Sequence, residues 1–243
     1  MSVTRSTKRQ KRQAASSSNC GTKNHLELRD IGPITDNQVK TFQYYNENKN
    51  VFLLGCAGTG KTFLSLYLAL KEILYQKTDK RQIVIIRTAQ PTKQIGFLPG
   101  DEATKMDVYE APYRAICSEL FNRDDAYEIL KQKGVIVFAG TSFLRGCTIN
   151  ESIIIADEVQ NCGYQELRTV LTRPGDKSKI ILCGDTRQDD LTSKRYNEFS
   201  GIQDIMKVLG NVESMKTVIF DIDDIVRSNF VRDFIIAEYE AGI

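Results

Sequence analysis

The chain has 243 residues, of which 41% are hydrophobic and 26% are charged, and its formal net charge is only +2. This composition predicts one substantial core, with no apolar run near the roughly 18 residues of a membrane span and no apolar signal core after the basic start. The six cysteines are scattered without C-x-x-C pairs, and a disulfide at Cys56 would distort the glycine-rich loop described below, so a reducing cytoplasm is the expected setting.

Residues 1–25 differ in composition from the rest of the chain. They are rich in Ser and Gln and lack apolar periodicity, which predicts a disordered basic tail. Its basic side chains include Arg5, Lys8, Arg9, Lys11 and Arg12. The tail either attracts nucleic acid phosphates at low salt or is simply a solvated terminus, and the small net charge does not decide between them. We expect the folded domain over residues 26–243.

A short apolar strand leads into a glycine-rich loop in the run VFLLGCAGTGKT, from Val51 to Thr62. The run matches G-x-x-x-x-G-K-[ST], in which glycines let backbone N–H groups converge on phosphates and the next helix presents its positive N-terminus. The expected nucleotide-binding residues are Gly55, Cys56, Ala57, Gly58, Thr59, Gly60, Lys61 and Thr62. Lys61 supplies a cation for the β and γ phosphates, and Thr62 supplies a hydroxyl for Mg²⁺. A plain strand-to-helix turn is the alternative, but the whole pattern favours a P-loop NTPase.

Further apolar, β-branched runs predict strands that are buried on both faces of a parallel sheet. These runs are Gln82–Arg87, Val135–Gly140, Ser152–Glu158, Lys179–Asp185 and Lys216–Ile222. Helical patterns that supply the crossovers lie at Lys105–Leu120, Asp124–Lys133, Gly163–Thr172 and Gly201–Leu209. The expected architecture is a doubly wound α/β domain with a mainly parallel sheet and its chemistry at the carboxyl ends of the strands.

Two acids, Asp157 and Glu158, end one of these strands and form a Walker B pattern. Asp157 is expected to hold Mg²⁺ through water, and Glu158 to orient and polarise the attacking water as a general base. The alternative is a solvated strand end. The next strand ends at Asp185, and the amide of Gln188, three residues later, could reach a γ-phosphate as a sensor. Capping of a turn explains Asp185 and Gln188 equally well.

Several motifs in this order resemble the PhoH family, whose ATPase domain is related to the RecA-like cores of superfamily 1 helicases. They are PITDNQ (33–38), GCAGTGKT (55–62), IGFLPGDEATKM (95–106), FLRGCTIN (143–150), IIIADEVQN (153–161), GDTRQDDL (184–191) and DIVRS (224–228). The resemblance runs from about Ile31 to the C-terminus. A single domain of this size resembles the versions carried by bacteriophages, which would place the protein in a host's cytoplasm.

The resemblance implies roles in ATP hydrolysis for several further residues. Gln38 would lie at the adenine and favour ATP over GTP, and Gln160 would couple the ATP site to its surroundings. Gln188 would be the sensor, and Arg227 an arginine finger. Plainer roles are a surface helix position for Gln38, a helix cap for Gln160 and an ion pair with a neighbouring acid for Arg227. Because the chain has one RecA-like domain, the finger is expected in trans, in a homo-oligomeric ring such as a hexamer.

Three departures from the family pattern limit this transfer of roles. Cys56 and Thr88 stand where proline is usual, and Cys147 replaces the second arginine of R-G-R-T. The segment from Pro91 to Lys105 mixes lysines with Phe97 and suits base stacking and phosphate contact, or equally a structural lid or a subunit contact.

The leading functional prediction is a Mg²⁺-dependent ATPase that acts on single-stranded RNA or DNA. The alternative is a nucleotide-gated assembly or regulatory switch whose hydrolysis ignores nucleic acid. A ribonuclease domain, which some family members carry, does not fit in the roughly fifty residues before the P-loop. The only histidine, His25, is expected at the surface and not in catalysis.

Overall fold

The structure is a computed structural model that describes residues 26–87, 102–144, 146–185 and 201–241. The predicted basic tail, residues 91–101 and Gln188 lie outside the described residues. No helix in the described ranges is both long and apolar enough to cross a membrane.

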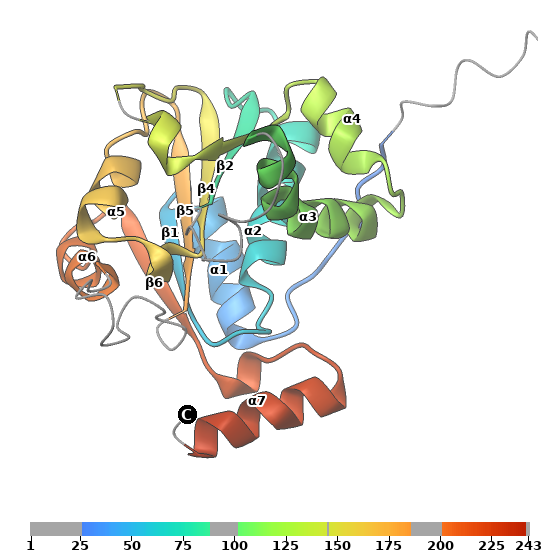
Figure 1. The fold of residues 1–243 in the computed structure, drawn as a ribbon, viewed down its shortest axis with the longest axis vertical. Helices are drawn as coiled ribbons and strands as arrows, with labels where there is room; N and C mark the ends of the chain where they lie inside the picture. Colours follow the sequence, from blue (N-terminus) through green and yellow to red (C-terminus); the bar gives the residue numbers. More distant parts are fainter. Residues whose placement is uncertain (1–25, 88–101, 145, 186–200, 242–243) are drawn as a thin grey trace, which may run out of the picture.

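A six-stranded sheet forms the centre of the domain (Figure 1). Its strands are β1 (Asn50–Gly55), β2 (Gln82–Arg87), β3 (Ile136–Gly140), β4 (Ser152–Asp157), β5 (Lys179–Gly184) and β6 (Met215–Phe220). The strand order is β3-β2-β4-β5-β1-β6, and every neighbouring pair is parallel. The predicted doubly wound parallel sheet is therefore confirmed, and β5 separates the glycine-rich loop after β1 from the acids that end β4.

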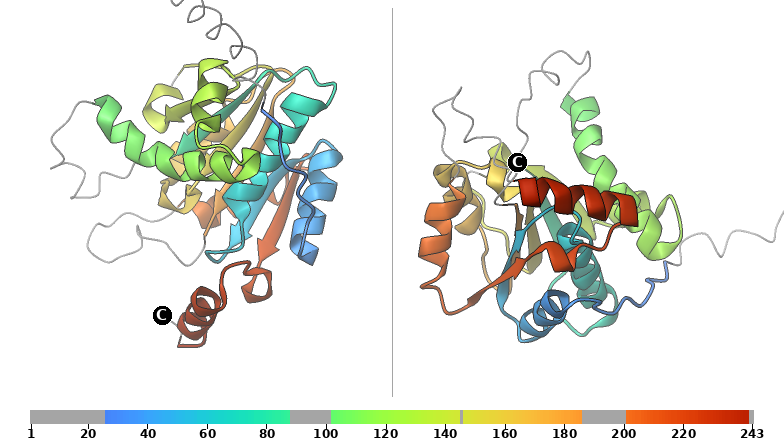
Figure 2. Two further views of the ribbon diagram at one scale, coloured as in Figure 1. Left: turned by 90° about the vertical axis from the view of Figure 1, so that its right-hand side faces the viewer. Right: turned by 90° about the horizontal axis from the view of Figure 1, so that it is seen from below.

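Helices cover both faces of this sheet, as Figures 1 and 2 show. They are α1 (Asp36–Asn46), α2 (Lys61–Tyr75), α3 (Glu102–Phe121), α4 (Ala126–Gln132), α5 (Tyr164–Leu171), α6 (Ile202–Leu209) and α7 (Asn229–Ala241). The first four pack on one face and α5 and α6 on the other. The last helix, α7, lies beyond the carboxyl ends of the strands (Figure 1).

Alternating residues of the strands build two cores, one on each face. On β1, Val51 and Leu53 face the core under α2, α3 and α4, whereas Phe52 and Leu54 face the core under α5 and α6. Apolar side chains at every strand position are thus needed because both faces are covered. This explains the continuous apolar runs of β1, β4 and β5.

The prediction of burial on both faces is wrong for β3 and β6. These are the two edge strands of the sheet, and Val137 on β3 and Ile219 on β6 are exposed. An edge strand has a neighbour on one side only, so part of its surface reaches solvent in spite of its apolar sequence. Helix α7 has no counterpart among the elements expected from the sequence, and α1 was expected only as the plainer, surface helix position of Gln38.

Candidate functional site

The loop between β1 and α2 has the backbone that its glycines predict. Gly55, Gly58 and Gly60 have φ values of +141°, +81° and +80°, a region that L side chains rarely adopt. A Cβ atom on Gly55 would also overlap the carbonyl oxygen of Phe220 at the end of β6. The loop therefore requires glycine at its start for steric as well as conformational reasons.

The side chain of Lys61 folds back onto this loop. Its Nζ donates hydrogen bonds of 2.8 Å to the carbonyl oxygens of both Gly55 and Cys56, and a longer one of 3.4 Å to Oγ1 of Thr59. Helix α2 begins at Lys61 itself, so its first backbone N–H groups and its dipole point into the same space. A cation and a helix N-terminus together make this an anion-binding position.

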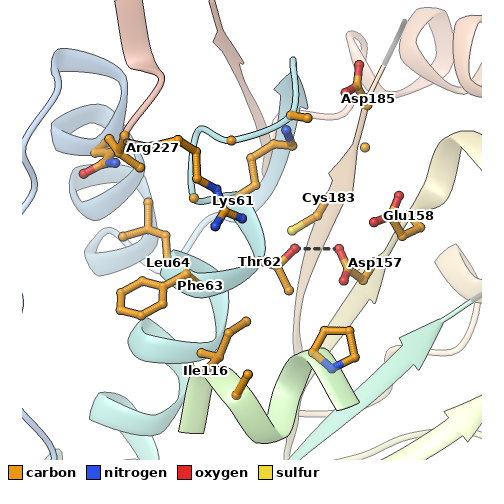
Figure 3. A pocket seen from close by; sticks show the side chains of 18 of the residues that line it. Lys61, Thr62, Phe63, Leu64, Ile116, Asp157, Glu158, Cys183, Asp185 and Arg227 are labelled. Carbon is orange, nitrogen blue, oxygen red and sulfur yellow. Dashed lines mark hydrogen bonds between the residues drawn. The ribbon is translucent and has the colours of Figure 1, made fainter. Parts of the chain in front are cut away.

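Thr62 and Asp157 meet across the cleft, where the hydroxyl of Thr62 donates a 2.9 Å hydrogen bond to Oδ1 of Asp157 (Figure 3). Two such oxygens suit Mg²⁺, which keeps several waters and uses one or two protein oxygens together with substrate phosphates. The described residues hold no group of three His, Cys, Asp or Glu side chains that would form an all-protein metal site. This donor set fits a metal that is brought in with a nucleotide.

Glu158 adopts a left-handed backbone with φ of +56° directly after β4. Its Oε2 accepts a 2.6 Å hydrogen bond from Gln160, and its Oε1 lies 3.9 Å from Nη2 of Arg87. Burial, followed by the charge of Asp157, raises the pKa of Glu158 above its ordinary value. A strained backbone and a raised pKa at the edge of a cleft are features of functional carboxylates.

Gln160 connects Glu158 to the end of the next strand. While its Nε2 donates to Glu158, its Oε1 accepts the backbone N–H of Asp185 at 3.0 Å. Gln160 and Asp185 are both buried. The amide of Gln160 thus connects the carboxyl ends of β4 and β5. The plainer role expected from the sequence, the cap of a helix, does not describe these two hydrogen bonds.

Gln38 is buried, although it lies in the first turns of α1. Its Oε1 accepts the backbone N–H of Ile34 at 3.0 Å, and its Nε2 lies 3.9 Å from the position of a Cβ atom on Gly60. The plainer expectation of a surface helix position is therefore wrong. The hydrogen bond to Ile34 fixes the amide beside the glycine-rich loop.

Arg227 also lies beside this loop, in the segment between β6 and α7. The preceding residue, Val226, donates its backbone N–H to the carbonyl oxygen of Gly58 at 3.0 Å. Among the described residues Arg227 has no ion pair with Asp223 or Asp224, which was the plainer expectation.

These side chains line one cleft of about 750 Å³ (Figure 3). The predicted residues that line it are Gln38, Ala57, Gly58, Gly60, Lys61, Thr62, Asp157, Glu158, Gln160, Asp185 and Arg227. The other three predicted residues of the loop, Gly55, Cys56 and Thr59, do not line the cleft. Gln188 lies outside the described residues, so its role stays a prediction.

Two residues at this site were not predicted from the sequence. Arg87 ends β2 in register with Asp157, so its position at a strand's carboxyl end was a usable signal. Tyr113, in the middle of α3, donates a 2.8 Å hydrogen bond to Oδ2 of Asp157. No local pattern marks Tyr113, because its partner is 44 residues away in the sequence.

The sheet order, the loop and the acids that face it define a RecA-like P-loop NTPase. The sequence pattern of the PhoH family, described as PhoH-like protein, matches residues 30–240. The chain belongs to the PhoH family.

Relatives in this family are similar over most of the chain. A PhoH-like protein of Mycobacterium leprae (strain TN) is 31% identical over 218 residues, 86% of this chain and 59% of that protein. A PhoH-like protein of Synechocystis is 34% identical over 190 residues, 78% and 56% of the two chains. Protein PhoH of Escherichia coli K12 is 31% identical over 206 residues, 83% and 57%. The chain thus spans less than two thirds of the length of these relatives.

Solved structures with a similar fold include the large terminase of a thermophilic bacteriophage. It has a TM-score of 0.46 and 13% identity, over 84% of this chain and 50% of that chain. The DNA-bound helicase MrfA has a TM-score of 0.43 and 12% identity, over 80% and 29%. Likeness at this level carries no conclusion about activity or partners.

Proposed function

We propose that the protein hydrolyses ATP in a Mg²⁺-dependent reaction at the cleft between the P-loop and the end of β4. The observation that carries this proposal is the 2.9 Å contact between Thr62 and Asp157, with Glu158 next to it. It places a hydroxyl and a carboxylate suited to Mg²⁺ opposite each other and a second carboxylate at the edge of the same space. This division of roles between two acids suits hydrolysis by water.

Each side chain has a separate task in the proposed reaction. Lys61 binds the β and γ phosphates in place of the loop carbonyls that it now contacts. Thr62 and Asp157 would hold a Mg²⁺ ion, which when bound would neutralise charge on the phosphates. Glu158 takes up the proton of the attacking water, and Gln160 holds the carboxylate in place during this step.

The proposal of ATP as the nucleotide rests on Gln38. One lone pair of its Oε1 accepts the N–H of Ile34, and its Nε2 lies on the P-loop side of the cleft. The second lone pair of Oε1 would accept the N6 amino group of adenine while Nε2 donates to N7, whereas guanine has an acceptor, O6, in place of that amino group. A fixed amide beside a base discriminates by unpaired hydrogen-bonding groups when the wrong base enters. Competition between ATP and GTP for binding measures this preference directly.

Coupling to single-stranded RNA or DNA is also proposed, by analogy with the helicase-like cores that the sequence resembles. Lys93, Phe97 and Lys105 supply the basic and aromatic groups for such binding. The alternative, a nucleotide-gated assembly or regulatory switch in the cytoplasm, needs the same cleft but no polymer.

We further propose a homo-oligomer, such as the ring expected from the resemblance. Helix α7 supports this proposal because Phe230 and Phe234 are 80% and 55% exposed on it. Exposed apolar groups that cluster on one helix mark interaction surfaces. Phe230→Asp should lower the mass of the particle in light scattering, while Lys207→Asp on α6 should leave the mass unchanged.

The decisive experiment measures steady-state ATP hydrolysis with and without single-stranded RNA and DNA. Lys61→Ala subtracts contaminating activity. Hydrolysis that depends on Lys61 and Mg²⁺ supports the ATPase, and stimulation by one polymer identifies that polymer as the partner. Hydrolysis that ignores both polymers favours the switch, and turnover equal to that of Lys61→Ala contradicts the ATPase.

A further inference from the structure

Arg227 is held against the P-loop of its own chain. The N–H of Val226 donates to the Gly58 carbonyl at 3.0 Å, and a Cβ atom on Gly58 would lie 3.0 Å from Cγ of Arg227. The Val226 side chain also lies 3.6 Å from the Cβ position of Gly60. The segment before α7 therefore packs directly on the loop that its own chain supplies.

Asp224 fixes the start of this segment. It is 3% exposed, and its Oδ2 accepts a 2.7 Å hydrogen bond from Asn37 and a 3.0 Å hydrogen bond from the backbone N–H of Asp221. Asn37 is the neighbour of Gln38 on α1. The segment that carries Arg227 is thus tied both to the P-loop and to the helix that carries Gln38.

The position of Arg227 along the cleft indicates which part of a nucleotide it meets. In Figure 3, Glu158 and Asp185 lie on one side of Lys61 and Thr62, whereas Arg227 lies on the other. The acids mark the γ-phosphate end, because the attacking water must be next to Glu158. Arg227 is therefore at the opposite end, where Gln38 also lies.

The charge of Arg227 is available for a ligand. Its side chain is exposed and lines the cleft, and none of the ion pairs of the described residues involves it. A guanidinium in this position offers donors to a phosphate or ribose and a flat cation to the face of a base.

We infer that Arg227 binds the nucleoside and α-phosphate portion of the nucleotide held by its own chain, as a binding residue in cis. This inference rests on the proposed nucleotide-binding function of the cleft. It differs from the arginine finger expected from the resemblance, which would reach the γ-phosphate of a neighbouring subunit. The two roles make opposite predictions for ADP.

The first test measures the affinity of the purified protein for fluorescent ADP and ATP with Mg²⁺ present. In cis, Arg227→Ala should weaken both nucleotides by a similar factor of about 10 to 100, because both share the part that Arg227 contacts. Arg232→Ala is the matched control, since Arg232 is exposed on α7 and is not among the residues that line the cleft. Unchanged ADP affinity together with reduced ATP turnover would overturn the inference.

The second test mixes two variants that are each defective. Lys61→Ala subunits keep Arg227 but have no working P-loop, whereas Arg227→Ala subunits have the reverse defect. A finger in trans would restore hydrolysis in the mixture, and a binding residue in cis would leave it at the sum of the separate variants. Recovered hydrolysis would contradict the inference even if ADP affinity fell.

Failure of the inference is distinct from failure of the proposed function. Wild-type protein that binds no nucleotide would contradict the proposed function. Wild-type protein that binds and hydrolyses ATP, with an Arg227→Ala variant that binds ADP equally well, would contradict only the role of Arg227. Thermal unfolding of each variant checks that the substituted chain is folded.

Discussion

The buried hydroxyl of Tyr113 donates a 2.8 Å hydrogen bond to Oδ2 of Asp157, the carboxylate that faces the P-loop. Because Thr62 donates to the other oxygen of the same carboxylate, both oxygens of Asp157 have defined partners from two different helices. Tyr113 is only 1% exposed and packs on Phe138 with ring centroids 5.7 Å apart, so its hydroxyl has little freedom to move. Tyr113 therefore orients Asp157 so that Oδ1 faces Thr62.

Tyr113→Phe should weaken Mg²⁺-dependent nucleotide binding by about 10-fold or more, which is the usual effect of removing a partner of a metal-binding side chain. Nucleotide affinity in EDTA should stay the same, because the P-loop contacts do not involve Tyr113. A titration of Mg²⁺ at fixed nucleotide measures the difference.

Tyr127→Phe is the control for Tyr113→Phe. Tyr127 is equally buried on the same face of the sheet, and neither hydrogen bond to the carboxylate of Asp157 comes from it. It should leave the Mg²⁺ titration unchanged. Equal effects of the two substitutions would show that Tyr113 acts through packing alone.

Glu158→Gln should reduce kcat by about 10²- to 10⁴-fold while nucleotide affinity changes little, because an amide cannot accept the proton of the attacking water. Gln160→Ala should give a smaller loss of kcat, since it removes the 2.6 Å hydrogen bond that holds Glu158 but leaves the carboxylate present. Single-turnover hydrolysis and equilibrium binding separate the two quantities. A Glu158→Gln variant with wild-type kcat would exclude this residue as the base.

The sheet and the phosphate-binding loop could be predicted because their signals are local. The runs before Gly55 and Asp157 are continuous and apolar; the first leads into the P-loop, and the second ends at Asp157, which lines the cleft. Contacts between distant segments gave no such signal. The pairing of Tyr113 with Asp157 and the packing of Arg227 on Gly58 depend on where α3 and the segment before α7 lie in space.

Gly55→Ala should destabilise the protein much more than Gly134→Ala. Gly134, with φ of +69°, has a left-handed backbone that costs an alanine about 1–2 kcal/mol, whereas Gly55, with φ of +141°, lies farther from the conformations that L residues adopt. Only at Gly55 would the new Cβ also overlap the Phe220 carbonyl, whereas nothing lies within 4 Å of the Cβ position on Gly134. Urea unfolding measures the loss of stability in each variant, and equal losses would mean that β6 shifts freely away from β1.

A buried ionic network lies at the opposite end of the sheet from the cleft. Glu72 on α2 accepts hydrogen bonds from Tyr45 at 2.6 Å and Lys179 at 3.3 Å, and its other oxygen is 2.9 Å from Lys80. Burial alone would raise the pKa of Glu72, but these hydrogen bonds and the charge of Lys179 outweigh it and hold the pKa below its ordinary value.

This depressed pKa predicts how stability depends on pH. The folded chain keeps Glu72 ionised where the unfolded chain has already bound a proton, so the contribution is complete above the ordinary value of 4.5 and is lost as pH falls toward the folded pKa. Glu72→Gln should remove this part of the acid sensitivity, measured as the difference in unfolding free energy between pH 7 and the acid range. An unchanged difference would mean that Glu72 has the same pKa in both states.

Removal of the Glu72 carboxylate should also destabilise the folded protein, because the buried charge of Lys179 then has no counter-ion. Glu72→Ala leaves Lys179 buried without its counter-ion and should cost about 3–5 kcal/mol at neutral pH. Replacement of both partners, as Glu72→Gln with Lys179→Met, should recover most of that loss, because an apolar side chain in the place of a buried cation needs no counter-ion. If the double variant is as unstable as Glu72→Ala, the hydrogen bonds to Tyr45 and Lys80 stabilise this end of the sheet more than the pairing with Lys179 does.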